Sequence, residues 1–167
     1  MDYIGQHFDR KVYWLDYDKF SADKLPDKDW ICLAVANTNP DSYNFDKFVR
    51  ASIDSGIVEF KGHGTFGEKL HDLFDETMSV MEVMEKHSEI GVMTTWHNRQ
   101  TLADAFWQCF FATCLPDTVD YDNIKVVCTD LDSVDRRQEL KDYLDRFNKG
   151  WLPSSDDNDN QKIKKNA

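Results

Sequence analysis

Positive charge is scarce in this sequence. Its 167 residues include 20 Lys and Arg against 31 Asp and Glu, which gives a formal net charge of -11 at pH 7. A chain this acidic repels the phosphates of nucleic acids and of anionic lipid surfaces, so we expect neither nucleic acid nor membrane as a partner. A basic protein would complement the charge, and we expect a partner of that kind.

Long apolar runs and secretion signals are also missing. No stretch approaches the length of a membrane span, and the first residues, MDYIGQHFDRK, hold no apolar core of a signal peptide. The four cysteines include no C-x-x-C pair, so zinc and redox sites lack support. These features predict a cytoplasmic protein with reduced thiols, no metal site and no cofactor.

Three catalytic signatures are absent as well. The sequence contains no G-x-x-x-x-G-K-[ST], no G-x-S-x-G and no H-E-x-x-H motif. These motifs mark phosphate-binding loops, serine hydrolases and zinc proteases, so the sequence argues against all three classes.

What the sequence does contain is a regular alternation of strand and helix patterns. Four apolar runs, at 30–36, 57–60, 90–95 and 124–131, each lead into a segment with apolar residues at helical spacing. Such alternation predicts parallel strands joined by right-handed crossovers. We therefore predict an α/β fold, a three-layer sandwich of flavodoxin or Rossmann type around a four-stranded parallel sheet. The expected strand order is 2-1-3-4, which puts the first and third runs in the centre.

The boundaries of this domain follow from composition. We expect the α/β domain at 30–152, an N-terminal arm at 1–29 and a disordered tail at 153–167, where the sequence is polar and lacks apolar periodicity. The segment KVYWLDYDKF at 11–20 fits either an edge strand or an arm that covers one face of the sheet.

A site is expected where the strands end, because ligands of open parallel sheets bind at the carboxyl edge. The candidate catalytic residues there are His63, His97 and Asp130, with Asp130 oriented toward His97 from the neighbouring strand end. The candidate ligand-binding residues at the same edge are Asn37, Gly62, Gly64, Gly67, Thr94, Thr95 and Trp96.

The segment GHGTFG at 62–67 matches G-x-G-x-x-G and opens a helix, where main-chain N–H groups can hold a phosphate. It follows the second strand, however, and the next strand lacks the acid that a dinucleotide-binding site needs after it. We favour a glycine-rich turn, with Lys61 keeping weak anion binding open.

His97 has two possible roles. The turn interpretation places Trp96 and His97 after the third strand, where the imidazole donates to a loop carbonyl and holds the chain. The catalytic interpretation needs a carboxylate to orient one ring nitrogen. We favour the structural role.

The segments HDLFDE, TTWH and LADAFW resemble an uncharacterised family of small bacterial α/β domains, over about residues 28–150. The matching residues are Asp72, Asp75, Thr94, Thr95, Trp96 and His97. The resemblance implies a bacterial-type cytosolic domain and no particular activity. By analogy with other small acidic α/β domains, we predict an immunity- or defence-associated interaction protein without enzymatic activity. The alternative is a small enzyme or a nucleotide- or phosphate-binding domain with its site at the carboxyl edge.

Overall fold

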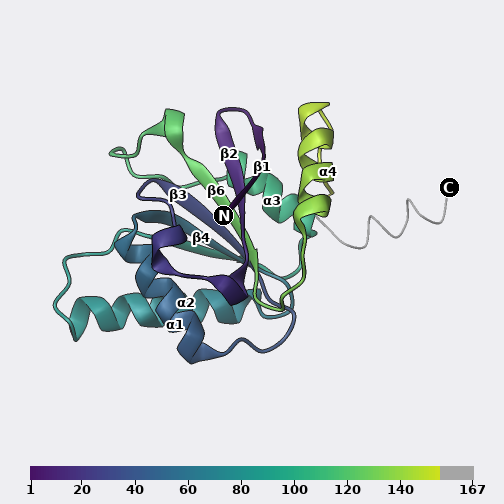
Figure 1. The fold of residues 1–167 in the computed structure, drawn as a ribbon. Helices are drawn as coiled ribbons and strands as arrows, with labels where there is room; N and C mark the ends of the chain where they lie inside the picture. Colours follow the sequence, from purple (N-terminus) through teal and green to yellow (C-terminus); the bar gives the residue numbers. More distant parts are fainter. Residues whose placement is uncertain (155–167) are drawn as a thin grey trace.

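The computed structural model describes residues 1–154, which form a six-stranded sheet with two helices on each face (Figure 1). The strands are Asp2–His7 (β1), Arg10–Leu15 (β2), Trp30–Val35 (β3), Ile57–His63 (β4), Met93–His97 (β5) and Lys125–Asp130 (β6). The α-helices are Ser42–Asp54 (α1), Gly67–Val83 (α2), Leu102–Phe111 (α3) and Arg137–Asn148 (α4). Short 3-10 turns span Tyr17–Lys19 (η1), Ala22–Lys24 (η2) and Tyr121–Asn123 (η3). The predicted tail at 153–167 lies outside the described residues from position 155 onward.

The sheet is larger than the sequence predicted. Its order is β1-β2-β6-β3-β4-β5, with β1 antiparallel to β2 and all other neighbours parallel. The expectation of a four-stranded parallel sheet is therefore wrong. The additional strands come from the range 1–29, which was predicted as an arm. Of the two interpretations of 11–20, an edge strand or an arm, neither is observed: the segment begins with the strand β2, but β2 is internal and pairs with β1 on one side and β6 on the other.

The order of the four predicted strands also differs. The four predicted strands, numbered 1 to 4 in chain order, are β3, β4, β5 and β6. They lie in the order 3-2-1-4 instead of 2-1-3-4. The third of them, β5, is at the edge, where Met93 is 42% and Trp96 48% exposed. The fourth, β6, is internal, and its residues from 126 to 130 are buried. The order 3-2-1-4 is also that of the first four strands of doubly wound dinucleotide-binding sheets.

The helices divide between the two faces because the strand residues alternate. Cys32 and Ala34 of β3 face the layer of α1 and α2, whereas Ile31 and Leu33 face α3 and α4. Aromatic side chains fill both interfaces. Those on the α1 and α2 side include Phe45, Phe48, Phe60 and Phe74, and those on the α3 and α4 side include Trp14, Phe106, Phe110 and Phe147.

Three helix ends are determined by local sequence signals. The Thr101 hydroxyl accepts a hydrogen bond from the Asp104 N–H at the start of α3 (3.0 Å). Gly56 and Gly150 follow α1 and α4 with φ of 80° and 83°, a conformation that glycine adopts without strain. These local signals depend only on neighbouring residues, so the sequence contains them in full.

Candidate functional site

The switch point of the sheet lies between β3 and β6. The chain adds β4 and β5 on one side of β3 and then returns to place β6 on the other side. Ligands of open α/β sheets bind at such a point, outside the carboxyl ends of the strands. The loops that border it are residues 36–41 after β3 and residues 131–136 after β6.

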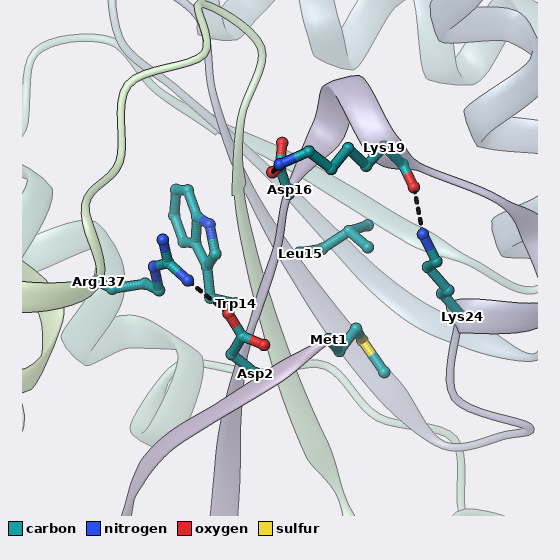
Figure 2. Close-up of a pocket in the computed structure, with 8 residues that line it drawn as sticks. All are labelled: Met1, Asp2, Trp14, Leu15, Asp16, Lys19, Lys24 and Arg137. Carbon is teal, nitrogen blue, oxygen red and sulfur yellow. Dashed lines mark hydrogen bonds and ion pairs between the residues drawn. The ribbon is translucent and has the colours of Figure 1, made fainter.

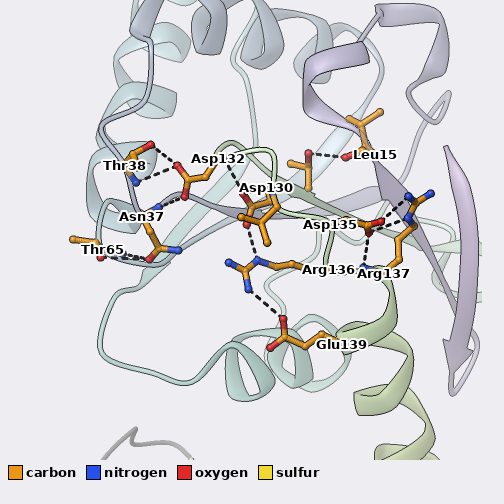
Figure 3. Close-up of polar contacts among 12 residues, drawn as sticks. Leu15, Asn37, Thr38, Thr65, Asp130, Asp132, Asp135, Arg136, Arg137 and Glu139 are labelled. Atoms are coloured by element: carbon orange, nitrogen blue, oxygen red, sulfur yellow. Dashed lines mark hydrogen bonds and ion pairs between the residues drawn. The ribbon is translucent and has the colours of Figure 1, made fainter.

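The carboxylate of Asp132 links these two loops (Figure 3). Its Oδ2 accepts a hydrogen bond from the Asn37 N–H (2.6 Å), and its Oδ1 accepts from the Thr38 N–H (3.1 Å) and the Thr38 hydroxyl. Partial burial raises the pKa of Asp132, but these hydrogen bonds outweigh it and the net change is downward. The ionised carboxylate of Asp132 therefore accepts hydrogen bonds from the main-chain N–H groups that an anionic ligand would need.

Asp130 is fully buried and binds the loop that follows it (Figure 3). Its Oδ2 accepts from Arg136 Nε (2.6 Å), and its Oδ1 accepts from the N–H groups of Asp132 (2.8 Å) and Val134 (3.3 Å). Strand β6 is three strand spacings from β5, which is about 14 Å. The structure thus does not bring Asp130 to His97, because the expected strand order that made them neighbours is not the observed one.

His63 and His97, by contrast, are neighbours in the β4–β5 ladder. The strand β5 reaches His97, so Trp96 and His97 lie within the strand and not in the turn that the sequence predicted. His63 Nδ1 donates to the main-chain oxygen of His97 (2.9 Å). The two candidate catalytic residues therefore meet, through the imidazole of His63 and the main chain of His97.

Both ring nitrogens of His97 have partners inside the protein. Its Nδ1 donates to Gln100 Oε1, and its Nε2 accepts from the Thr95 hydroxyl (3.2 Å), with the tautomer assigned from these partners. Burial lowers the pKa of His97 to about 4, against the opposing effect of Gln100, and the charges of Lys61 and His63 lower it further. At neutral pH the ring is uncharged, and its pKa is well below the value that suits a general base.

The glycines of GHGTFG are required by close packing. A Cβ on Gly62 would lie 2.3 Å from the oxygen of Gly67, and a Cβ on Gly67 would lie 2.7 Å from Asn98 Oδ1. Gly64 has a φ of 91°, which strains other residues. The three glycines let the end of β4 approach the start of α2.

The N–H groups that a phosphate would need at this loop are engaged. Four successive residues donate within the protein: Thr65 to Asn37 Oδ1 (3.1 Å), Phe66 to the Ala36 oxygen (2.9 Å), Gly67 to the Gly64 oxygen (3.0 Å) and Glu68 to Asn98 Oδ1 (2.9 Å). Asn98, which the sequence interpretation missed, is the side chain that caps α2. It follows directly after TTWH (94–97), and no local motif connects it to 62–67.

A buried ion pair was also missed. Glu59 and Lys61 of β4 are each 1% exposed, and Lys61 Nζ lies 2.6 Å from Glu59 Oε1. Lys61 also donates to the Ala112 oxygen at the end of α3 (3.0 Å), and Glu59 accepts from the Cys114 N–H (3.2 Å). Residues two apart in a strand share one face, so the spacing of Glu59 and Lys61 could have predicted this pair from the sequence. Lys61 is thus committed to Glu59 and to α3 and is not placed to hold an anion at the loop.

The residues of the HDLFDE and TTWH segments meet where α2 packs on β5. The Trp96 ring lies edge-on to His71, with 4.6 Å between centroids. His71 Nδ1 is 3.0 Å from Asp72 Oδ1, and its Nε2 is 3.4 Å from Asp75 Oδ2. The Thr94 hydroxyl donates to Asp75 Oδ1 (2.7 Å). We call this group the β5 edge surface, which consists of Met93, Thr94 and Trp96 of β5 and His71, Asp72 and Asp75 of α2.

The cavities formed by residues 1–154 include two near the carboxyl edge. The first has a volume of about 260 Å³ at the end of β2 and contains both signs of charge (Figure 2); its lining residues are Met1, Asp2, Trp14, Leu15, Asp16, Lys19, Lys24 and Arg137. Lys19 is paired with Asp16 (2.7 Å) and Arg137 with Asp2 (2.5 Å). The second, about 460 Å³, lies beside the β5 edge surface and is lined by Glu68, Trp96, His97, Asn98, Arg99 and Gln100.

Within residues 1–154, no three His, Cys, Asp or Glu side chains are grouped as metal ligands. In the same part of the chain, no helix is long and apolar enough to cross a membrane.

Residues 12–147 match the family described as "Domain of unknown function (DUF7684)". The chain belongs to this family. The DUF7684 match runs from β2 to α4 and includes the carboxyl edge, the β5 edge surface and both helical layers. The prediction of an uncharacterised family is confirmed. No curated protein and no solved structure matches the chain.

Proposed function

We propose that the protein is a non-enzymatic interaction domain of the cytoplasm that binds a basic partner protein. One observation carries the proposal: the polar groups at the carboxyl edge of the sheet form hydrogen bonds with other groups of the protein. Asp132 occupies the main-chain donors at the switch point, Asp130 is bound to Arg136, and both nitrogens of His97 are engaged. A catalytic site leaves such groups aimed at the space where substrate binds.

The surface charge supports a basic partner. The formal charge is -11 for the whole sequence. Part of the excess lies on α2, where a single cation, Lys69, stands against five acids: Glu68, Asp72, Asp75, Glu76 and Glu82. Complementary charge accelerates encounter and rejects partners of like charge. All four cysteines are free thiols, which supports a reducing compartment.

Equilibrium binding of a simple probe tests this function. The full chain is titrated with a ten-residue peptide of alternating lysine and valine, and separately with its glutamate–valine counterpart, at low and at physiological salt. We expect saturable binding of the lysine peptide that weakens as salt screens the charges, and no binding of the glutamate peptide.

The opposite pattern would support the alternative function. If the lysine peptide fails to bind while ATP or inorganic phosphate binds saturably, and His97→Gln abolishes that binding without lowering the melting temperature, the domain is a nucleotide or phosphate binder and the interaction proposal is wrong.

A further inference from the structure

Strand β5 is an edge strand without the usual protection. It pairs only with β4, and in the described part of the chain no strand lies on its outer side. Edge strands are commonly protected against further pairing by lysine, proline or a bulge. The sequence MTTWH of β5 contains no Lys, Pro or Gly. The opposite edge, β1, is interrupted by a bulge between Tyr3 and Gly5.

The two faces of β5 differ in character. Thr94 and Trp96 face α2, where they contact Asp75 and His71. Met93, which is 42% exposed, lies on the other face together with Thr95 and His97. A strand added about 4.8 Å beyond β5 would continue both faces, one beside the carboxylates of α2 and one beside an apolar side chain.

Charge determines what fits the α2 side. Glu68 and Asp72 are exposed and stand one helical turn apart on α2. Glu68 lines the same cavity as Trp96, which is 48% exposed, and Asp72 pairs with His71, whose ring contacts Trp96. The lone cation of α2, Lys69, is bound to Asn39 (2.6 Å). An ammonium or guanidinium group is attracted both to carboxylates and to the face of an indole ring. The one cation lining the adjoining cavity is Arg99.

We propose that the free edge of β5 binds an extended, lysine- or arginine-bearing segment of a partner protein as an additional strand. Its basic side chains lie over Trp96 and the carboxylates of α2, and its alternate side chains lie beside Met93. Main-chain hydrogen bonds supply affinity, and the alternating side chains supply selectivity. This inference rests on the proposed function and assigns it a place and a geometry.

A second copy of the chain is a poor occupant of the same edge. Pairing β5 with β5 of another copy would bring two α2 helices together, each with five acids and one lysine. Like charges at short range oppose that arrangement, whereas a basic segment neutralises them.

Amide hydrogen exchange with the lysine–valine peptide tests the site. We expect bound peptide to slow exchange in residues 93–97 and to leave β1, the other edge, unchanged. Two further peptides carry N-methyl groups on alternate residues, in opposite phases. The one whose methyl groups point at β5 cannot form the ladder and is expected to bind at least about tenfold more weakly than the other, whose N–H groups toward β5 are intact.

Matched variants separate the β5 edge from charge in general. The pair Glu68→Gln and Asp72→Asn removes two charges beside β5, and Asp142→Asn with Asp145→Asn removes two from the surface of α4. We expect the first pair to weaken binding about fivefold and the second to have a much smaller effect. Trp96→Ala should weaken binding about tenfold or more, whereas Tyr121→Ala, which removes a side chain of similar exposure, should not.

Three results would overturn the β5 site. If the peptide binds but residues 93–97 gain no protection, or if the α2 and α4 pairs weaken binding equally, the basic partner binds elsewhere and the proposed function survives without this site. If residues 93–97 are protected only in a self-associated form, the occupant is a second copy. Failure of the lysine peptide to bind the parent protein at all would instead contradict the proposed function itself.

Discussion

The Nδ1 atom of His63 donates a hydrogen bond to the main-chain oxygen of His97, over 2.9 Å. The contact joins the ends of β4 and β5 at the last pair of their ladder. This hydrogen bond fixes the orientation of the His63 ring and links the ends of the two strands. The sequence predicted that the His97 imidazole donates to a loop carbonyl. It is His63 that donates to a main-chain carbonyl, whereas His97 Nδ1 donates to the side chain of Gln100.

The first prediction concerns pH. Burial lowers the pKa of folded His97 to about 4, below the ordinary value of 6.5, so the unfolded chain binds a proton that the folded chain refuses. The contribution of His97 to stability is complete above pH 6.5 and is lost as pH falls toward 4, by about 3 kcal/mol at the limit. Urea unfolding of the parent and of His97→Gln at pH 7, 5.5 and 4.5 measures it.

His97→Gln should have a flatter stability profile over this range, because glutamine does not titrate. Carboxylates that lose charge at the same pH are common to both proteins and cancel in the difference. Parallel profiles for the two proteins would show that His97 is not the group responsible.

Local sequence patterns predicted the elements well, and the reason is visible at particular residues. The run 30–36 is apolar throughout because β3 is covered on both faces, and Thr101 caps α3 through a residue three positions away. Strand order depends on which distant segments pair, and periodicity does not encode that. The run 90–95 was predicted as a central strand because it begins with apolar residues. Its two hydroxyl residues, Thr94 and Thr95, instead indicated an edge strand.

The candidate site was harder to predict than the fold because it depends on the order of strands. His97 and Asp130 would be partners in one order and are separated by two strands in the other. Asp132 meets Asn37 only because β6 returns beside β3. Asn98 caps a helix that begins thirty-one residues earlier in the chain, at Gly67, and that contact has no local signature.

The second prediction concerns the buried ion pair. Lys61→Met leaves the carboxylate of Glu59 without its counter-charge, and Glu59→Gln does the same to the ammonium while keeping an acceptor for the Cys114 N–H. Each single change should reduce the free energy of unfolding by about 3–5 kcal/mol. The double variant should lose clearly less than the sum, because no unpaired charge remains. Additive losses in chemical denaturation would mean that the two side chains do not act as a pair.

The third prediction compares two glycines. A methyl group on Gly62 would lie 2.3 Å from the Gly67 oxygen, which is backbone, so Gly62→Ala must displace the start of α2. We expect a loss of more than about 3 kcal/mol. Gly91 has no atom within 4 Å of its added Cβ, and Gly91→Ala should change stability by less than about 1 kcal/mol in either direction. Thermal unfolding of both variants gives the comparison, and equal effects would contradict it.

The last prediction concerns the carboxylate at the switch point. Asp132→Ala removes the acceptor for the N–H groups of Asn37 and Thr38 and should reduce the free energy of unfolding by about 1–3 kcal/mol. The exposed donors then form a cradle for a small anion. Inorganic phosphate at millimolar concentration should restore part of this loss, on the order of 1 kcal/mol, by binding the folded state alone.

The control is Asp135→Ala, which removes the same charge from the same loop but leaves the cradle filled, since Asp135 pairs with Arg137. Melting temperatures are compared in phosphate and in chloride at equal ionic strength, so that screening is the same in both. We expect phosphate to raise the melting temperature of Asp132→Ala by several degrees more than that of Asp135→Ala or the parent protein. An equal response in all three would mean that Asp132 links the loops without occupying an anion site.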